Sequence, residues 1–526
     1  MFDRLYPMML CLSFAFGAAC GDDDSAADGS DADAGDVAAE DVAVDGDGDV
    51  TEADGPDVED DGGDAEADGD GGPARDLRAT VLLGEGGFFG VSGVAVDGLV
   101  SGGGAAFAVG AHYAVVEGGT AEEPIHAGRV YLFAGDPLPG VVAEAVQVLE
   151  PADGVTHPEG GFGYALAAPC DIDGDGRLDL VVGNHLWGDT SMPAHGRVVV
   201  FYGSDAGGLD VGRSTTHLLS PVLRERSDVF GQTVLCADFD GDTFTDLLAT
   251  GQNAGEHDTG VAAIFAGSAA GLPEHETTVL EPPVATVNRQ YLGSATAWHD
   301  VDGDGERDLL VGGWGLIAGG RLSDPHTGGV LVYAGGTDWT AGPAATLGPG
   351  TTDEVQAGTS LAAFDAGGRT FVAVGVPGWV DGGTTGAVLV WTAGAPGFEA
   401  GLPQVLRPAA GTADVGFAQS LEFVPDYFGV GRGALLVGMK HGDCDASRTG
   451  TGVVAVFALG GDGVFAGEAE LLCAPAPAVM DAFGGSITAL GDLDGDGLRD
   501  FTIGMESHIE GDLETGVQTG GVVIYR

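Results

Sequence analysis

Four nine-residue stretches of one pattern decide the fold of this chain. They are DIDGDGRLD (171–179), DFDGDTFTD (238–246), DVDGDGERD (300–308) and DLDGDGLRD (492–500). Each has Asp at positions 1, 3, 5 and 9 and Gly at position 4, and each leads into a continuous apolar run such as DLVVG (179–183). The pattern predicts a tight carboxylate-rich turn between two strands, repeated along the chain.

Carboxylates at alternate positions of a tight loop converge on one side, where they repel one another until a divalent cation neutralises them. We expect Ca2+, because a flexible oxygen-rich site suits its larger radius, whereas Mg2+ retains more of its water. One ion in each of the four loops gives about four ions, held by the four Asp side chains and the backbone carbonyl at position 7. The predicted ligands are Asp171, Asp173, Asp175, Arg177 and Asp179; Asp238, Asp240, Asp242, Phe244 and Asp246; Asp300, Asp302, Asp304, Glu306 and Asp308; and Asp492, Asp494, Asp496, Leu498 and Asp500.

One of the four loops departs from the pattern at position 6. That position is Gly in three loops and Thr243 in the loop 238–246. Glycine permits the left-handed turn that aims the carboxylates inward, whereas a β-branched residue resists a positive φ. We therefore expect the loop 238–246 to bind its ion most weakly.

A second motif recurs in phase with these loops, a short step of an apolar or similar residue next to Gly. The steps are FFG (88–90), GFG (161–163), VFG (229–231), YLG (291–293), QAG (356–358), GFA (416–418) and AFG (482–484). Their spacing defines seven units. Units one, five and six replace the carboxylate loop by VDGLVSGGGA (96–105), FDAGGRT (364–370) and VPDYFGVGRG (424–433).

Each unit has the same order of predicted strands. The step opens an apolar run, the turn and a second apolar run follow, and a β-branched strand such as RVVVF (197–201) and a fourth strand such as TTVLEPP (277–283) complete the unit. Four strands repeated seven times predict an all-β fold, a seven-bladed β-propeller over residues 76–526. The last unit ends at its third strand, VVIYR (522–526), so we expect ATVLL (79–83) to complete that blade and close the ring.

Composition agrees with this fold and limits the function. Gly accounts for 96 of 526 residues, which disfavours long helices. The chain has 81 acidic and 19 basic residues and a net charge of −62. Binding to nucleic acid is excluded, because it needs clustered Lys and Arg to replace counterions, whereas divalent cations are natural partners.

The N-terminal region predicts export. The apolar run from Met8 to Ala19 is too short to span a bilayer and matches the core of a signal peptide. It resembles a bacterial lipoprotein signal (1–19), in which Cys20 is lipidated; an ordinary signal peptide is the alternative. Residues 20–75 hold a run of acids without bases from Asp22 to Asp70 and predict a disordered tether. This places the protein at a bacterial outer membrane or cell surface, with membrane contact through the lipid alone.

Four cysteines remain in the predicted propeller, Cys170, Cys236, Cys444 and Cys473. In an exported chain they favour one or two disulfides, and Cys444 with Cys473 is the preferred pair because both belong to one unit. Four free thiols are the alternative.

The step, the DxDGDGxxD loop and the following DLxxG run together resemble FG-GAP repeats, as in the N-terminal propeller of integrin α subunits. The resemblance implies calcium loops on one face, a ligand site for a protein or a carbohydrate on the opposite face, and a role in adhesion or ligand binding rather than catalysis. We expect no von Willebrand-type insert, leg domain or transmembrane helix. Related propellers also occur in polysaccharide lyases and phospholipase-type proteins. A calcium-dependent polysaccharide lyase or hydrolase is therefore the alternative, with Lys440 as the candidate base.

Three tryptophans lie in the loops expected on the ligand face, Trp187, Trp314 and Trp379. Exposed tryptophans stack on sugars or anchor protein partners, so these are the candidate ligand-binding residues; packing between blades is the alternative. Histidines also occur in these loops without recurrent spacing, and we interpret them as scattered loop residues: His112, His185, His195, His257, His326, His441 and His508.

Overall fold

The computed structural model describes residues 77–526 with internal gaps. The gaps are 85–86, 101–103, 117–124, 136–144, 152–159, 189–193, 222, 224–226, 256, 284–288, 318–325, 352, 354, 382–383, 394–401, 409–415, 430, 445–449, 468, 476–481, 508 and 511–516. The predicted signal, Cys20, the tether and His508 lie outside the described residues. Within these ranges, no helical segment has the length and apolar character that crossing a bilayer requires.

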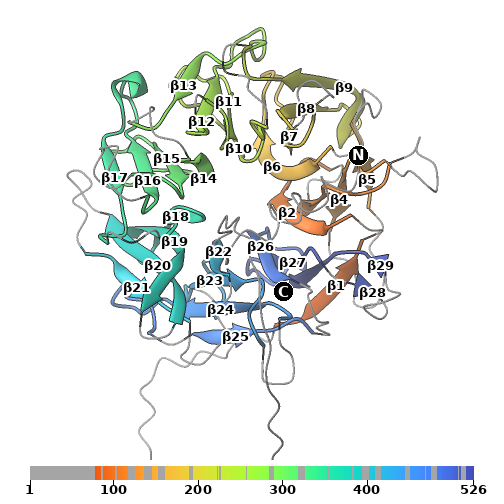
Figure 1. Cartoon of the computed structure of the whole chain (residues 1–526). Helices are drawn as coiled ribbons and strands as arrows, with labels where there is room; N and C mark the ends of the chain where they lie inside the picture. Colours follow the sequence, from red (N-terminus) through yellow and green to blue (C-terminus); the bar gives the residue numbers. More distant parts are fainter. Residues whose placement is uncertain are drawn as a thin grey trace, which may run out of the picture. The chain divides into compact units, whose positions relative to one another are not determined.

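The described chain forms seven four-stranded antiparallel sheets arranged as the blades of a ring (Figure 1). Blade 1 contains β2 (Phe89–Ala95), β3 (Ala106–Ala111), β4 (Arg129–Ala134) and β5 (Gln147–Leu149); blade 2 contains β6 (Phe162–Cys170), β7 (Asp179–Asn184), β8 (Arg197–Gly203) and β9 (Leu209–His217); blade 3 contains β10 (Val234–Ala237), β11 (Asp246–Gly251), β12 (Val261–Phe265) and β13 (Thr278–Leu280); blade 4 contains β14 (Leu292–His299), β15 (Asp308–Gly313), β16 (Gly329–Tyr333) and β17 (Ala345–Leu347). Blade 5 contains β18 (Leu361–Ala366), β19 (Arg369–Asp381), β20 (Thr384–Ala393) and β21 (Gln404–Leu406); blade 6 contains β22 (Phe417–Val424), β23 (Ala434–Met439), β24 (Val453–Ala458) and β25 (Glu470–Leu472); blade 7 contains β26 (Phe483–Ala489), β27 (Phe501–Met505), β30 (Gly521–Tyr525) and β1 (Ala79–Leu83). A small ribbon of β28 (Ile509–Glu510) and β29 (Val517–Gln518) and the 3-10 turn η1 (Trp339–Ala341) complete the described elements. The predicted seven-bladed propeller is confirmed.

The ring closes through the strand that precedes the first blade. β1 pairs antiparallel with β30, from Ala79 opposite Tyr525 to Leu83 opposite Gly521. The first and last described strands, β1 and β30, therefore share one sheet. This is the closure expected from the missing fourth strand of the last unit.

The first strand of each blade lies nearest the centre of the ring (Figure 1). The second and third strands lie in the middle of the blade, between the first and the fourth. β7 and β8 are buried along their whole length, which explains why their sequences are continuous apolar runs rather than alternating ones. The apolar clusters form between neighbouring blades; one of them joins Val130 and Leu132 of blade 1 to Phe162 and Phe201 of blade 2. The hydrophobic effect thus stabilises the junctions of the ring as well as each sheet.

Each predicted step is a backbone device that joins a blade to the one before it. Its first and third residues both have positive φ, as in Phe88 (58°) and Gly90 (94°). In five of the seven steps the middle residue bridges in parallel to the residue that precedes the third strand of the preceding blade, as Phe89 does to Gly520. A Cβ at Gly90 would lie 2.3 Å from the carbonyl oxygen of Gly521, so this step needs glycine for close approach as well as for its φ. The step of blade 6 has Ala418 at the same position, also with positive φ (67°).

Hydroxyl groups reinforce these junctions. The Ser486 hydroxyl of blade 7 donates to the Gly90 carbonyl of blade 1 at 2.7 Å, which ties the end of the ring to its start. Equivalent bonds are Ser92 to Gly163, Thr250 to Gly293, Ser294 to Gly358, Ser360 to Ala418 and Ser420 to Gly484. These side chains satisfy carbonyls that the left-handed steps turn away from the sheets.

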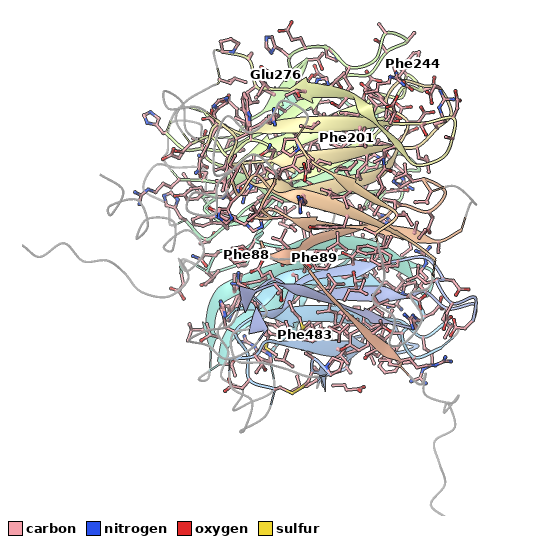
Figure 2. The ribbon with its side chains drawn as sticks, turned by 90° about the vertical axis from the view of Figure 1, so that its right-hand side faces the viewer. Phe88, Phe89, Phe201, Phe244, Glu276 and Phe483 are labelled. Carbon is pink, nitrogen blue, oxygen red and sulfur yellow. A yellow bond between two sulfur atoms is a disulfide. The ribbon has the colours of Figure 1, made fainter. Side chains whose placement is uncertain are left out.

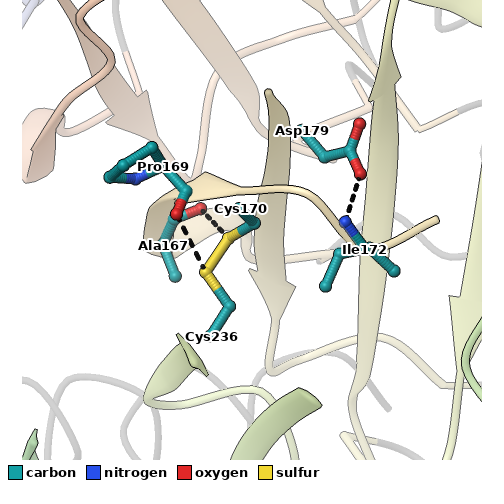
Figure 3. Close-up of a disulfide and its surroundings, with 6 residues drawn as sticks. All are labelled: Ala167, Pro169, Cys170, Ile172, Asp179 and Cys236. Atoms are coloured by element: carbon teal, nitrogen blue, oxygen red, sulfur yellow. Dashed lines mark hydrogen bonds between the residues drawn. A yellow bond between two sulfur atoms is a disulfide. The ribbon is translucent and has the colours of Figure 1, made fainter. Parts of the chain in front are cut away.

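The described part of the chain contains two disulfides. Cys444–Cys473 lies within blade 6, the pairing that the sequence favours. Cys170–Cys236 joins the first strands of blades 2 and 3, a link that the sequence alone does not identify (Figure 3). The four propeller cysteines are therefore not free thiols.

Removing the closing strand should destabilise the whole ring. Deletion of residues 76–87 removes the five residue pairs between β1 and β30, and at about 1 kcal/mol for each backbone hydrogen bond the loss is about 5 kcal/mol. Thermal unfolding should shift to a lower temperature and lose cooperativity. Deletion of residues 1–75 alone is the matched control, and an unchanged melting temperature after the longer deletion would contradict ring closure through β1.

A half-buried carboxyl of blade 6, Glu422 of β22, should make stability depend on pH. Burial raises the pKa of Glu422 from 4.5 to about 8, and Arg499 opposes this only in part. Because the folded state holds this proton more tightly than the unfolded state, stability falls as pH rises from about 4.5 to about 8. Glu422→Gln should flatten the dependence of melting temperature on pH across that window. An equally steep dependence in the variant would show that Glu422 is not its source.

Candidate metal sites and the opposite face

The four carboxylate loops all connect the first and second strands of their blades, in blades 2, 3, 4 and 7. In each loop three carboxylates offer oxygen atoms that lie within 4.8 Å of one another. The groups are Asp171, Asp173 and Asp179; Asp238, Asp240 and Asp246; Asp300, Asp302 and Asp304; and Asp492, Asp494 and Asp500. Positions 1 and 3 thus converge in every loop, with position 9 in three loops and position 5 in the loop 300–308.

The position 9 aspartate is buried and fixes the base of each loop. The Asp179 carboxylate accepts the Ile172 N–H at 2.7 Å (Figure 3). It also accepts the Gly203 N–H at 2.8 Å. Gly203 ends β8, the third strand of the same blade. The Asp179 side chain therefore holds the loop between β6 and β7 against the end of β8. Asp246 and Asp308 make the equivalent pairs of bonds, to Phe239 and Gly267 and to Val301 and Gly335.

The other carboxylates shape the loop by accepting backbone N–H groups two to five residues ahead. In the loop 492–500, Asp492 accepts from Gly497 at 2.8 Å, Asp494 accepts from Asp496 at 3.1 Å, and Asp496 accepts from Leu498 at 2.8 Å. The same pattern recurs in the other three loops. Such turns hold the carboxylates together although their charges repel.

The electrostatics of the loops fit a divalent cation. Oδ1 of Asp171 is buried and has no hydrogen-bond partner. Burial raises the pKa of Asp179 to about 6, and the neighbouring Asp173 and Asp171 raise it further against two backbone hydrogen bonds. Burial likewise raises the pKa of Asp246 and of Asp308. A cation bound among these oxygens would relieve both the desolvation and the repulsion, and all donors are hard oxygens.

Two loops differ from the others. Thr243 has φ of 79°, a left-handed conformation that a β-branched residue adopts only with strain. In the loop 171–179, Arg213 of β9 pairs with Asp173 and lies 3.8 Å from Asp175, and Arg177 pairs with Asp175 at 2.7 Å. Guanidinium groups therefore already neutralise part of this loop, a competition that the loop sequence does not reveal.

The connections between second and third strands leave the opposite end of each blade. Figure 2 shows the ring from the side, with Phe244 of a carboxylate loop and Phe88 of the first step toward opposite sides. The three candidate tryptophans are half-buried and packed. Trp187 and Trp314 lie in these connections, whereas Trp379, expected in a loop, lies near the end of β19. Trp187 lies under Arg197 (4.7 Å) and Trp379 lies under Arg407 (5.6 Å), while Trp314 stacks on Tyr291 with ring centroids 3.9 Å apart. Each keeps part of its surface open, so their role in ligand binding stays a prediction.

The structure corrects the interpretation of two histidines as scattered residues. His112 directly follows β3 and His185 directly follows β7, and both contact Tyr164 of β6. Sequence reasoning missed this pair because their spacing along the chain is one whole unit; their shared place after the second strand of a unit was the available signal. His195 instead packs against Trp187, and His326 bonds to the Gly315 carbonyl at 2.8 Å.

Comparisons with known proteins agree with this architecture. Residues 162–201 match a family model described as FG-GAP repeat. The chain is 30% identical to integrin alpha-5 of Xenopus laevis over 161 residues, which is 30% of this chain and 15% of that protein. It is 33% identical to human phosphatidylinositol-glycan-specific phospholipase D over 199 residues, 36% of this chain and 22% of that protein. Human integrin alpha-IIb is 30% identical over 159 residues, 29% of this chain and 15% of that protein. The chain thus spans less than a quarter of the length of each of these relatives and resembles them as an FG-GAP, integrin-like propeller.

The arginine at the first loop should weaken cation binding there. Arg213→Ala removes a positive charge beside Asp173 and should raise the affinity of the loop 171–179 for Ca2+ by about two- to fivefold, the size expected for a partly exposed ion pair. Calcium titration calorimetry of the two proteins measures this change. Arg407→Ala, beside Trp379, is the control and should leave every calcium affinity unchanged. Equal or weaker calcium binding by Arg213→Ala would contradict the competition.

Proposed function

We propose that this protein is a calcium-braced propeller that presents a ligand-binding face opposite its carboxylate loops and acts in adhesion or in the capture of a protein or carbohydrate. The observation that carries the calcium part is the recurrence of one oxygen cluster, with the same internal hydrogen bonds, at the same turn of four blades. The similarity to two integrin alpha chains supports the binding role.

The calcium ligands in this proposal are the aspartates at positions 1, 3, 5 and 9 of each loop and the carbonyl at position 7. A bound divalent cation supplies positive charge that cancels the mutual repulsion of the carboxylates. The chain's own part is to hold these oxygens in place, because the buried position 9 side chains of blades 2, 3 and 4 bond both to their own loop and to the end of the third strand. Stability, rather than chemistry, is what the ion contributes.

A surface location completes the proposal. Residues 1–19 direct export, Cys20 carries the lipid at the outer membrane or cell surface of a bacterium, and residues 20–75 act as the spacer. Two disulfides support an oxidising compartment, because cytosolic proteins rarely keep them. The net charge of −62 argues against nucleic acid as the ligand.

A calcium-dependent polysaccharide lyase or hydrolase is the second candidate. It is favoured by the position of Lys440, whose Nζ lies 3.4 Å from Oε1 of Glu506 on the face opposite the carboxylate loops. The similarity to a phospholipase D also leaves room for catalysis by a protein that contains such a propeller. Incubation with acidic polysaccharides, followed by ultraviolet absorbance of unsaturated products, tests it; turnover abolished by Lys440→Ala would replace adhesion by catalysis.

Metal removal tests the calcium proposal. Elemental analysis of the purified protein should find about four Ca2+, one for each described cluster. Chelation should lower the melting temperature markedly, since a site at a hundredfold ligand excess contributes about 2.7 kcal/mol. Asp304→Ala should lower the melting temperature in calcium more than Asp242→Ala, because strain at Thr243 already weakens the second site. Re-addition of Mg2+ alone is the control and should restore less. A protein that contains no metal, and whose melting temperature does not change when a chelator is added, would contradict the proposal.

A further inference from the structure

Six side chains from four blades lie close together near the centre of the ring, on the face opposite the carboxylate loops. We call this cluster the histidine mouth; it consists of Phe88, His112, Tyr164, His185, Lys440 and Glu506. Phe88 and Tyr164 belong to the innermost strands or their steps, and the other four directly follow second strands. Figure 2 places Phe88 on the side of the ring away from Phe244.

The contacts across the mouth are direct. The rings of Tyr164 and His185 lie 3.9 Å apart, those of His112 and Tyr164 5.5 Å apart, and those of His112 and His185 6.1 Å apart. Phe88 lies 5.2 Å from His112. Glu506 acts electrostatically on His112 and Tyr164 while it pairs with Lys440, so blades 6, 7, 1 and 2 all contribute.

Polar atoms in and around the mouth lack partners within the described part of the chain. Nδ1 of His112 is buried without a hydrogen bond, and so is Oε1 of both Gln232 and Gln419. Gln232 and Gln419 follow the steps of blades 3 and 6 as Tyr164 follows the step of blade 2, so they lie at the same level of the ring. Asn184, next to His185, is 1% exposed, and neither atom of its amide has a partner. Unsatisfied buried groups of this number are costly unless a ligand or water meets them.

The available groups are uncharged. Burial lowers the pKa of His112 to about 4, against the opposing carboxylate of Glu506, and lowers that of His185 to about 3. Burial raises the pKa of Tyr164 to about 12. At neutral pH both imidazoles are therefore neutral and the phenol is protonated. The two charged side chains of the cluster, Lys440 and Glu506, neutralise each other.

We propose that the histidine mouth binds an uncharged saccharide. This rests on the proposed function, of which it names the ligand class and the binding residues. Sugar hydroxyls both donate and accept hydrogen bonds, as neutral imidazole, amide and phenol groups require, and the aromatic face of Tyr164 offers an apolar surface to a sugar ring. An anionic ligand would meet the strongly negative protein without a free cation in the cluster, and a cationic ligand would have to displace Lys440 from Glu506.

An array of neutral oligosaccharides of glucose, galactose, mannose and N-acetylglucosamine, probed with the calcium-loaded protein, tests the proposal. The strongest binder is then titrated by calorimetry. His185→Ala and Gln232→Ala should each weaken binding at least tenfold, which is about 1.4 kcal/mol. His275→Ala, a histidine between β12 and β13 outside the histidine mouth, is the matched control and should leave the affinity unchanged.

Wild-type protein gives an independent measurement should His185→Ala fail to fold. In nitrogen-15 spectra the imidazole signals of His112 and His185 should shift when the saccharide is added, and those of His275 should not. Affinities indifferent to both substitutions, or binding confined to acidic glycans, would overturn the proposal. So would the absence of binding at about 10 mM saccharide, far weaker than useful recognition. If chelation still lowers the melting temperature in that case, the calcium-braced propeller stands and the saccharide site alone fails.

Discussion

The ring depends on the left-handed step with which each blade begins. Two residues with positive φ turn the chain, and in five steps the residue between them bridges to the preceding blade; a glycine at the third position of six steps allows two backbones to approach closely. A sheet alone specifies only its own strands; this step specifies where the next sheet lies. Because the same step also joins blade 7 to blade 1, the geometry that links neighbours is the geometry that closes the circle.

The carboxylate loops impose a different constraint at the other end of the blades. Each holds like charges together through backbone hydrogen bonds. In blades 2, 3 and 4 the buried position 9 aspartate also connects the loop to the end of the third strand. The disulfide Cys170–Cys236 lies immediately before two such loops, in blades 2 and 3 (Figure 3). Blades without the loop use other contacts: Asp365 of blade 5 accepts from Thr370 and lies 3.1 Å from His299 of blade 4. This face is thus shaped by requirements of stability.

Repetition explains why most of this architecture could be predicted from the sequence. The four DxDGDGxxD loops and seven steps mark the blades, and ATVLL (79–83) could be assigned to the last blade because one strand was missing there. Contacts between units carry no such signal. The pair His112 and His185, the link from Cys170 to Cys236 and the arginine that reaches Asp173 each join residues whose separation is set by blade packing, which periodicity does not encode. The repeated sequence pattern identifies the features that the units share. These sites depend on residues that occur in only one or two units, so the pattern does not identify them.

This division has a consequence for where function can reside. In the four carboxylate loops, replacing an aspartate would disturb the charge balance and the hydrogen bonds that hold the loop. On the opposite face, the residue that follows the second strand lies outside the paired residues of the sheet, and its amino-acid type differs between blades. It is His in blades 1 and 2, Trp in blade 4, Lys in blade 6 and Glu in blade 7. Sevenfold geometry brings these unlike residues to one level of the ring. A repeated scaffold thereby produces an asymmetric surface, and asymmetry is what recognition of a single ligand requires.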